Sequence, residues 1–158
     1  MKNLFILLLA FSVMSCGEIS PKGKIENKNI PLEEFVNLNL EGKFRLFYIK
    51  SDSSFVNVET YPNILNNLKI KVKDRTLNIE EKRKTKGVDF YNITVYSKYN
   101  LEKVSIADSV EMNISSEIKT DNFRLNLKNN GKFIGSVNSR RAEVDMTGNF
   151  SGRCIKEL

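Results

Sequence analysis

The chain has 158 residues, among them 25 lysines and arginines, 19 aspartates and glutamates, two cysteines, and neither histidine nor tryptophan. The lack of histidine excludes catalysis by a Ser–His or Cys–His pair, and it leaves a zinc or other transition-metal site almost without ligands. We therefore expect neither a metal nor a cofactor.

The chain begins with a short apolar run that ends on a cysteine. Lys2 precedes residues 4–14, of which only Ser12 is polar. This run is about half as long as a membrane-spanning helix, and it matches the apolar region of a signal peptide. It leads into Val13-Met14-Ser15-Cys16, which resembles a bacterial lipobox. The alternative is a short N-terminal core strand followed by an incidental cysteine.

The lipobox resemblance implies cleavage between Ser15 and Cys16 and attachment of acyl chains, such as palmitate, to Cys16. Two or more chains give stable membrane anchoring. Residues 1–15 would then be a signal peptide, and the loss of Lys2 with it would leave 24 basic against 19 acidic side chains. Gly17 follows the cysteine where aspartate would favour retention in the inner membrane, so we expect a lipid-anchored envelope lipoprotein of the outer membrane, with its face undetermined.

Residues 16–29 are polar and contain Pro21, Gly23 and three lysines. This composition predicts a flexible tether between the lipid and the folded domain. The remaining residues, 30–158, are enough for one domain with a hydrophobic core.

A period of two dominates the rest of the chain. Residues 68–73 alternate strictly, and residues 77–80 resume the alternation after a turn at 74–76, which predicts a β-hairpin. Its outer face would hold Lys69, Lys71 and Lys73 near Glu80 as a cross-strand charge partner.

Shorter alternating segments predict further strands at 44–48, 56–58 and 93–95. Only residues 61–67 indicate a helical turn, and no window of a dozen residues shows a helical period. We therefore predict an all-β protein.

The second half contains a short sequence repeat. Three alternating segments, each followed by a turn with Gly, Asn or Asp, recur along the chain: Val104-Ser-Ile106, Leu125-Asn-Leu127 and Val144-Asp-Met146. Their spacing of about 20 residues lies in the range of solenoid repeats. Stacked coils of a β-solenoid would align Ile106, Leu127 and Met146 as an interior ladder. The alternative is an antiparallel β-sandwich with evenly spaced turns.

Two segments carry a resemblance to a known family: YPNILNNL at 61–68 and VKDRTLNI at 72–79, followed by the Leu-x-Leu strands and Gly/Asn turns. They are similar to the family "putative auto-transporter adhesin, head GIN domain", over about residues 30–158. The resemblance implies a right-handed β-solenoid in a lipoprotein or secreted protein, typically of Bacteroidetes-type bacteria, with no defined catalytic or ligand residues. Asn129 stands where a turn glycine is usual.

The chain ends where a fourth repeat is due. Adding the spacing between Leu125 and Val144 to Val144 places the next strand near position 163, beyond Leu158. We expect either an end-to-end contact with a second chain or a C-terminally shortened family member with a frayed last coil, and we favour fraying.

The densest basic run consists of Lys82, Arg83, Lys84 and Lys86. It is a candidate contact for anionic ligands such as lipopolysaccharide phosphates or acidic glycans. The alternative is a solvated loop between two strands. No aromatic residues interrupt the run to provide a stacking platform, so we expect no nucleic acid partner.

Paired carboxylates occur at 33–34 and 80–81. Adjacent residues of a strand point to opposite faces, so neither pair forms the two-carboxyl cleft of a glycosidase. Four aromatic residues, Phe90, Tyr91, Tyr96 and Tyr99, form a second candidate group, either for stacking on sugars or for filling the core.

Two isolated residues have a chemical interpretation. Asp108-Ser109-Val110 resembles the O-glycosylation acceptor of Bacteroidetes-type envelope proteins, which makes Ser109 a candidate site. Cys154 has no intramolecular partner once Cys16 is acylated, and we expect it to be a small buried hydrophobe.

Together these features predict a membrane-anchored lipoprotein that acts as a non-catalytic adhesion, binding or scaffold module and is not an enzyme. Its partners would be the membrane, through its acyl chains, and a glycan or another envelope protein. The alternatives are a polysaccharide-binding or polysaccharide-degrading accessory protein and an envelope sensor or regulatory lipoprotein.

Overall fold

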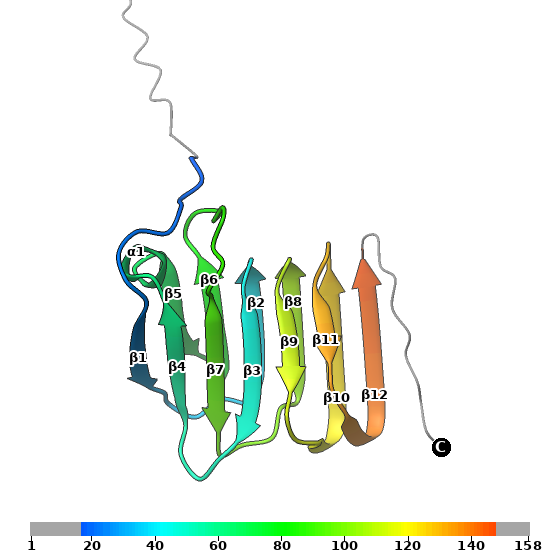
Figure 1. The fold of residues 1–158 in the computed structure, drawn as a ribbon. Coiled ribbons are helices and arrows are strands. Elements are labelled where there is room, and N and C mark those ends of the chain that lie inside the picture. The colour runs from blue at the N-terminus through cyan, green and yellow to red at the C-terminus, as the bar shows by residue number, and fades with distance from the viewer. Residues whose placement is uncertain (1–16, 148–158) are drawn as a thin grey trace, which may run out of the picture.

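The computed structural model of the chain describes residues 17–147. These residues form two six-stranded β-sheets that face each other, with one short helix, α1 (Pro62–Leu65), beside one end of the sheets (Figure 1). The prediction of an all-β protein is confirmed.

We name the two sheets by their place in Figure 1. The front sheet has the order β1 (Glu26–Pro31), β4 (Phe55–Thr60), β7 (Asn92–Ser97), β3 (Arg45–Lys50), β9 (Glu111–Ile114), β11 (Lys132–Ile134). The back sheet has the order β12 (Val137–Thr147), β10 (Ile118–Lys128), β8 (Lys103–Asp108), β2 (Asn37–Gly42), β6 (Thr76–Glu81), β5 (Leu68–Lys73).

Both sheets are mixed. The antiparallel pairs, β1–β4, β4–β7 and β5–β6, all lie at one end of the sheets, and the other seven pairs are parallel. In the parallel part the chain passes from a back strand to a front strand and returns, as in β8–β9–β10–β11. Each such pair of strands adds one strand to the back sheet and one strand to the front sheet.

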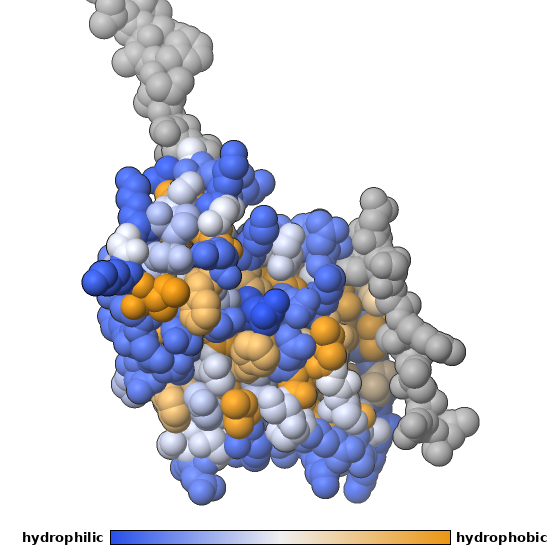
Figure 2. Space-filling model, in the orientation of Figure 1, coloured by the Kyte–Doolittle hydropathy of each residue, from blue (hydrophilic) through white to orange (hydrophobic). Residues whose placement is uncertain are grey.

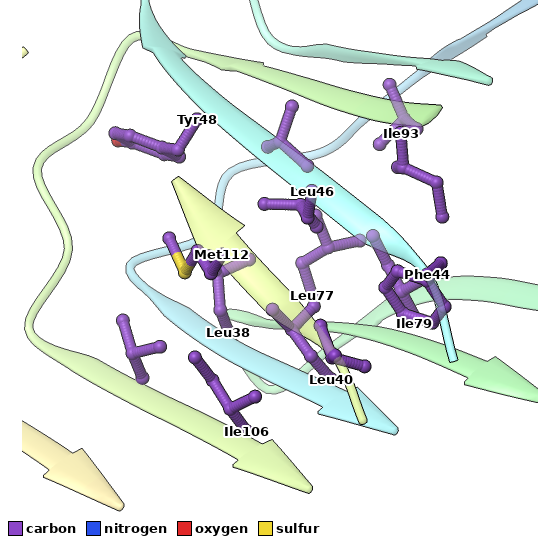
Figure 3. Packing of buried hydrophobic residues seen from close by; sticks show 14 of the residues in the cluster. Leu38, Leu40, Phe44, Leu46, Tyr48, Leu77, Ile79, Ile93, Ile106 and Met112 are labelled. Carbon is purple, nitrogen blue, oxygen red and sulfur yellow. The ribbon is translucent and has the colours of Figure 1, made fainter. Parts of the chain in front are cut away.

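The core lies between the sheets and is built from aliphatic residues in register. Along the back sheet one row consists of Ile79, Leu40, Ile106, Leu127 and Met146 on consecutive strands. The predicted stacking of Ile106, Leu127 and Met146 is therefore confirmed. Leu46, Ile93 and Met112 of the front sheet belong to the same buried cluster (Figure 3). Met146 is 44% exposed because its strand is the last of the back sheet, whereas Ile106 is 1% exposed.

The predicted hairpin is present as β5 and β6. Its turn is Asp74–Arg75, with φ angles of 50° and 56°, the conformation that a tight two-residue hairpin turn requires. Lys69 lies opposite Glu80 in the register, and their charged groups are 3.3 Å apart. The predicted helical turn at 61–67 is also confirmed, since α1 falls within it.

The order of the strands in space differs from their order in the sequence. β2, which the predicted strands omit, lies in the middle of the back sheet between β6 and β8. β7 likewise lies between β3 and β4, although β3 and β4 are consecutive in the chain. The antiparallel strands β1, β4 and β5 therefore lie beside the parallel strands at one edge of the two sheets, although β2 and β3 come between β1 and β4 in the chain.

Residues 17–29, for which the sequence predicts a tether, make defined contacts. Ile19 forms a parallel bridge with Thr85, and Asn63 Nδ2 donates a 2.8 Å hydrogen bond to the carbonyl of Ser20. β1 begins at Glu26, inside this segment, and pairs with β4. The start of the described chain is thus held against the antiparallel end of the sheets.

The interior rows predict a graded response to truncation. Ile106→Ala removes a fully enclosed side chain from the middle of a row, so we expect a loss of about 2–5 kcal/mol in the free energy of unfolding. Met146→Ala, at the exposed end of the same row, should cost less than about 1 kcal/mol. Urea unfolding of both variants measures the difference, and equal losses would contradict the stacking of these residues in one row.

Candidate binding surfaces

The outer face of the front sheet is formed by the residues that alternate with the buried ones. They make three rows across the strands. The first, which we call the apolar ridge, consists of Pro31, Phe55, Tyr96 and Ile49. The middle row consists of Asn29, Asn57, Thr94, Phe47, Asn113 and Ile134, and the third of Asn27, Glu59, Asn92, Arg45, Glu111 and Lys132.

The apolar ridge is a continuous stack. The rings of Phe55 and Tyr96 are 4.3 Å apart at their centroids and tilted by only 12°, and Ile49 follows Tyr96 in the register. Because neighbouring strands are about 4.8 Å apart, rings stacked across strands stand upright and expose their edges. The ridge therefore presents ring edges, including the hydroxyl-bearing edge of Tyr96, to solvent rather than the flat ring face that stacks on a sugar.

Further apolar side chains extend this surface into the middle row. Phe47 is half-buried and Ile134 is 51% exposed. Figure 2 shows several separate orange, hydrophobic areas among polar atoms on the visible face. A contiguous row of apolar side chains, such as the apolar ridge, is typical of an interaction surface, whereas isolated apolar groups are normal on any protein.

Polar contacts fix the side chains around the ridge. Asn57 Nδ2 donates to the amide oxygens of Asn27 and Asn29, at 2.6 and 2.7 Å. In the third row Glu111 pairs with both Arg45 and Lys132, at 3.7 and 3.8 Å. The face is thus an apolar strip with an ordered polar margin.

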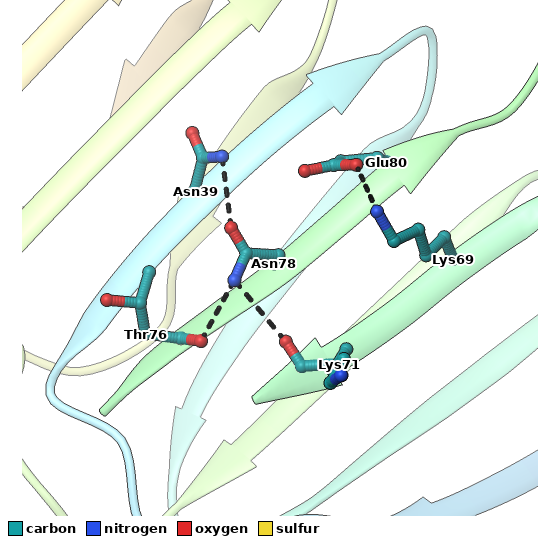
Figure 4. Close-up of polar contacts among 6 residues, drawn as sticks. All are labelled: Asn39, Lys69, Lys71, Thr76, Asn78 and Glu80. Atoms are coloured by element: carbon teal, nitrogen blue, oxygen red, sulfur yellow. Dashed lines mark hydrogen bonds and ion pairs between the residues drawn. The ribbon is translucent and has the colours of Figure 1, made fainter. Parts of the chain in front are cut away.

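The outer face of the back sheet is different in kind. Asn39 Nδ2 donates to Asn78 Oδ1 at 3.1 Å (Figure 4). Asn126 Nδ2 donates to Ser105 Oγ at 3.3 Å, and both bonds cross a parallel strand pair. Lys69 and Glu80 form an ion pair on the same face. Several of its polar groups pair with one another, which leaves fewer of them free for a partner.

The structure separates the four aromatic residues that the sequence groups together. Tyr96 alone belongs to the apolar ridge. Tyr91 is buried and packs on Phe44, with ring centroids 5.6 Å apart. Sequence reasoning missed Phe47 and Phe55, although both alternate with buried residues and could have been found by that period of two.

The carboxylate pair at 80–81 separates, as expected for adjacent strand residues, whereas Glu33 and Glu34 are both exposed in the loop before β2. Glu80 faces outward, and Glu81 is turned toward the core edge, where it accepts hydrogen bonds from the Thr85 hydroxyl at 3.0 Å and the Lys43 amide at 3.2 Å. Burial raises the pKa of Glu81, and burial together with the neighbouring Glu81 charge raises the pKa of Tyr91.

Gly42 makes room for the Glu81 side chain. A Cβ atom at position 42 would lie 2.7 Å from Glu81 Cγ, and the φ angle of Gly42 is 142°. The carboxylate of Glu81 is therefore enclosed by a turn, a hydroxyl and a ring, and the nearby charge of Asp108 adds to the rise in its pKa.

The remaining candidate residues lie apart from this face. Lys82, Arg83, Lys84 and Lys86 are exposed in the loop between β6 and β7. Ser109 is exposed in the turn after β8, and its amide donates to the carbonyl of Gly42 at 2.9 Å. Ser15, Cys16 and Cys154 lie outside the described residues.

Residues 17–147 contain no group of three or more Asp, Glu, Cys or His side chains that could hold a metal ion. They also contain no helix with the length and hydrophobicity needed to span a membrane. Two open hollows, of about 420 and 450 Å³, are lined by charged and polar residues of the loops and strand ends, such as Lys50 and Asp52 in one and Asp121 and Arg140 in the other.

Comparison with known families gives a match over residues 34–152 to the family described as "Putative auto-transporter adhesin, head GIN domain". The chain belongs to this family. The resemblance noted at 61–68 and 72–79 is confirmed. No curated protein matches the chain in sequence.

Solved structures with the same fold come from Bacteroides and Parabacteroides species. A putative adhesin from Bacteroides fragilis is 22% identical, with a TM-score of 0.71, and the match covers 82% of this chain and 62% of that protein. A putative adhesin from Parabacteroides distasonis is 21% identical, with a TM-score of 0.74 and coverage of 84% and 57%. A protein of the same species described as a putative lipid binding protein is 19% identical, with a TM-score of 0.62 and coverage of 84% and 65%. The chain thus spans less than two thirds of the length of each of these relatives.

The buried carboxyl of Glu81 predicts a pH dependence of stability. Because its pKa is raised by folding, the folded protein binds more protons than the unfolded chain between the two pKa values, and stability falls as the pH rises through that window. Glu81→Gln removes this dependence. The free energy of unfolding of the wild type, relative to the variant, should therefore increase as the pH is lowered from neutral.

Urea unfolding of both proteins at a series of pH values measures this difference. Glu80→Gln, on the outer side of the same strand, is the matched control. A change of the same size in the control would show that the effect does not come from the enclosed carboxyl.

Proposed function

We propose that this protein is a non-catalytic adhesion module of the cell envelope that binds a partner protein through the outer face of its front sheet. The observation that carries the proposal is the apolar ridge with its ordered polar margin. Protein interfaces have this arrangement, with an apolar centre rich in aromatic residues and a polar rim. Membership of an adhesin-type family supports a binding role.

The dimensions of the face are adequate for such an interface. Six strands at about 4.8 Å spacing make it roughly 25–30 Å wide. A partner that covers the ridge would remove the exposed ring edges and Ile134 from water, and Arg45 and Glu111 would lie at the margin. Ring edges without an open ring face favour a protein partner over a glycan.

We further propose that the module is anchored at the cell surface or in the periplasm by acyl chains on Cys16, after cleavage behind Ser15. The lipobox-like segment supports this, since Lys2, the apolar run and the cysteine occur at the expected spacing. An outer-membrane location is supported by Gly17. Acylation at one end leaves both sheet faces available for binding.

The parallel part of the fold fits a short right-handed β-solenoid, which we propose as its architecture. The nearly equal register offsets on the two sides of β10 support repeated coils of one back strand and one front strand. Leu125 pairs with Val144 of β12 on one side and with Val104 of β8 on the other. A solenoid of this kind lengthens by adding coils without changing the existing faces.

Anchoring predicts a change in mass and in location. The protein purified from membranes should begin at Cys16 and carry the mass of diacylglycerol, as measured by intact mass spectrometry. Cys16→Ala should move the protein out of the acylated, membrane-bound pool, and Cys154→Ala is the control that leaves it there. Retention of Met1 in the mature protein would contradict anchoring through Cys16.

Partner binding predicts a loss on truncation of the ridge. The purified protein is applied to a glycan array and to an array of envelope and host surface proteins. We expect protein hits whose dissociation constant rises at least tenfold in Tyr96→Ala, because central aromatic side chains dominate interface energies.

Asn39→Ala, on the outer face of the back sheet, is the matched control and should bind as the wild type does. The fold of each variant is checked by urea unfolding. Binding to glycans alone supports the polysaccharide-binding alternative, and release of shortened glycans supports an enzyme. Protein binding that survives Tyr96→Ala would contradict the proposed face.

A further inference from the structure

The net charge of the described residues is concentrated in one loop. Residues 17–147 hold 22 lysines and arginines against 18 aspartates and glutamates. Four of the positive charges lie in residues 82–86, which we call the basic loop, so the remaining described residues hold 18 charges of each sign and are neutral overall. The loop is thus a dense run of positive charge in a set of residues whose remaining charges sum to zero.

The basic loop is hydrogen-bonded to residues 17–19, the first residues that the structure describes. The Arg83 guanidinium donates two hydrogen bonds to the carbonyl of Gly17, at 3.0 and 2.6 Å. The Ile19 amide donates to the carbonyl of Lys84, and the Lys86 amide donates back to the carbonyl of Ile19, both at 2.9 Å. Ile19 and Thr85 therefore form a single parallel bridge, which holds the first described residues against the loop.

The charges of the loop are available to a ligand. Lys84 and Lys86 are exposed, and the ion pairs found among the described residues include none of the four cations of the loop. Arg83 and Lys82 are committed to carbonyl oxygens, of Gly17 and Asn66, which fixes the loop in place. A carbonyl oxygen carries no formal charge, so these two contacts leave the formal charge of the loop unchanged, and Glu18 is the acidic residue in the segment bridged to it.

We infer that the basic loop docks on the anionic headgroups of the membrane that holds the N-terminal anchor. The inference rests on the anchoring part of the proposed function, because acyl chains on Cys16 would bring the loop to the membrane surface within two or three residues of chain. Each lysine near an anionic leaflet strengthens binding about fivefold, and a basic patch beside a lipid chain gives a second attachment.

Docking through the loop sets the orientation of the domain. The loop follows the end of β6 and precedes β7, so it lies at the same end of the strands as the start of the described chain (Figure 1). The strands would then stand away from the membrane, and the apolar ridge would face sideways, free for a partner. Lys98 and Lys103 lie at the opposite end of the strands, after β7 and at the start of β8.

Lysine acetylation of the full chain on vesicles tests the inference. The protein is reconstituted into phosphatidylcholine vesicles with or without phosphatidylglycerol, and the rate at each lysine is read by mass spectrometry. We expect acetylation of Lys84 and Lys86 to be at least threefold slower on the anionic vesicles and to recover in high salt, with Lys98 and Lys103 unchanged. Equal rates on both vesicles, or slowing of all four lysines, would overturn the inference.

Variants and flotation separate this inference from the anchor. Lys84→Gln with Lys86→Gln should make acetylation of Lys82 independent of phosphatidylglycerol, whereas Lys98→Gln with Lys103→Gln should not. Flotation with neutral vesicles reports the anchor alone. If the protein floats only with anionic vesicles, and the loop variant no longer floats with them, the result contradicts anchoring through Cys16 and supports membrane docking by the basic loop. Protection of Lys84 and Lys86 by inorganic phosphate without vesicles would show an anion site and overturn membrane docking.

Discussion

The register between parallel strands is the constraint on which the rest of this structure depends. Inward residues such as Leu40, Ile106 and Leu127 occupy the same position on neighbouring strands, so each buries its side chain against the next. A shift by one residue would turn every one of them toward water. With the inward set fixed, the outward set is fixed as well, and residues far apart in the chain, such as Phe55 and Tyr96, meet in one row.

The corners between the sheets must keep this register, and a few residues in unusual backbone conformations allow it. Gly42, Asp108 and Asn129 have φ angles of 142°, 58° and 57° and occupy equivalent places at the ends of β2, β8 and β10. The amides that follow them, of Ser109 and Asn130, donate to the carbonyls of Gly42 and Asp108 at 2.9 and 2.8 Å. Asp and Asn tolerate the left-handed region better than other side chains do, so Asn129 serves where glycine is usual.

The sequence was sufficient for whatever depends on local periodicity. The hairpin, the helical turn and the alignment of Ile106 with Leu127 follow from spacing alone. The position of β2 between β6 and β8 could not be derived, because it depends on pairings across long stretches of chain, of Asn37 with Thr76 on one side and with Lys103 on the other. For the same reason the apolar ridge was missed: Phe55 and Tyr96 come from separate strands, and only the register places their rings together.

Because the faces and the ends of this fold come from different parts of the sequence, they can carry different interactions. Outward strand residues form the faces, and their substitution leaves the interior rows intact. One face can therefore be apolar at Phe47 and Ile134 while the other holds a network of amides around Asn78. Loops set the ends, and they concentrate charge without disturbing either face. A ridge on a face and a basic loop at an end point in perpendicular directions, so occupation of one does not obstruct the other.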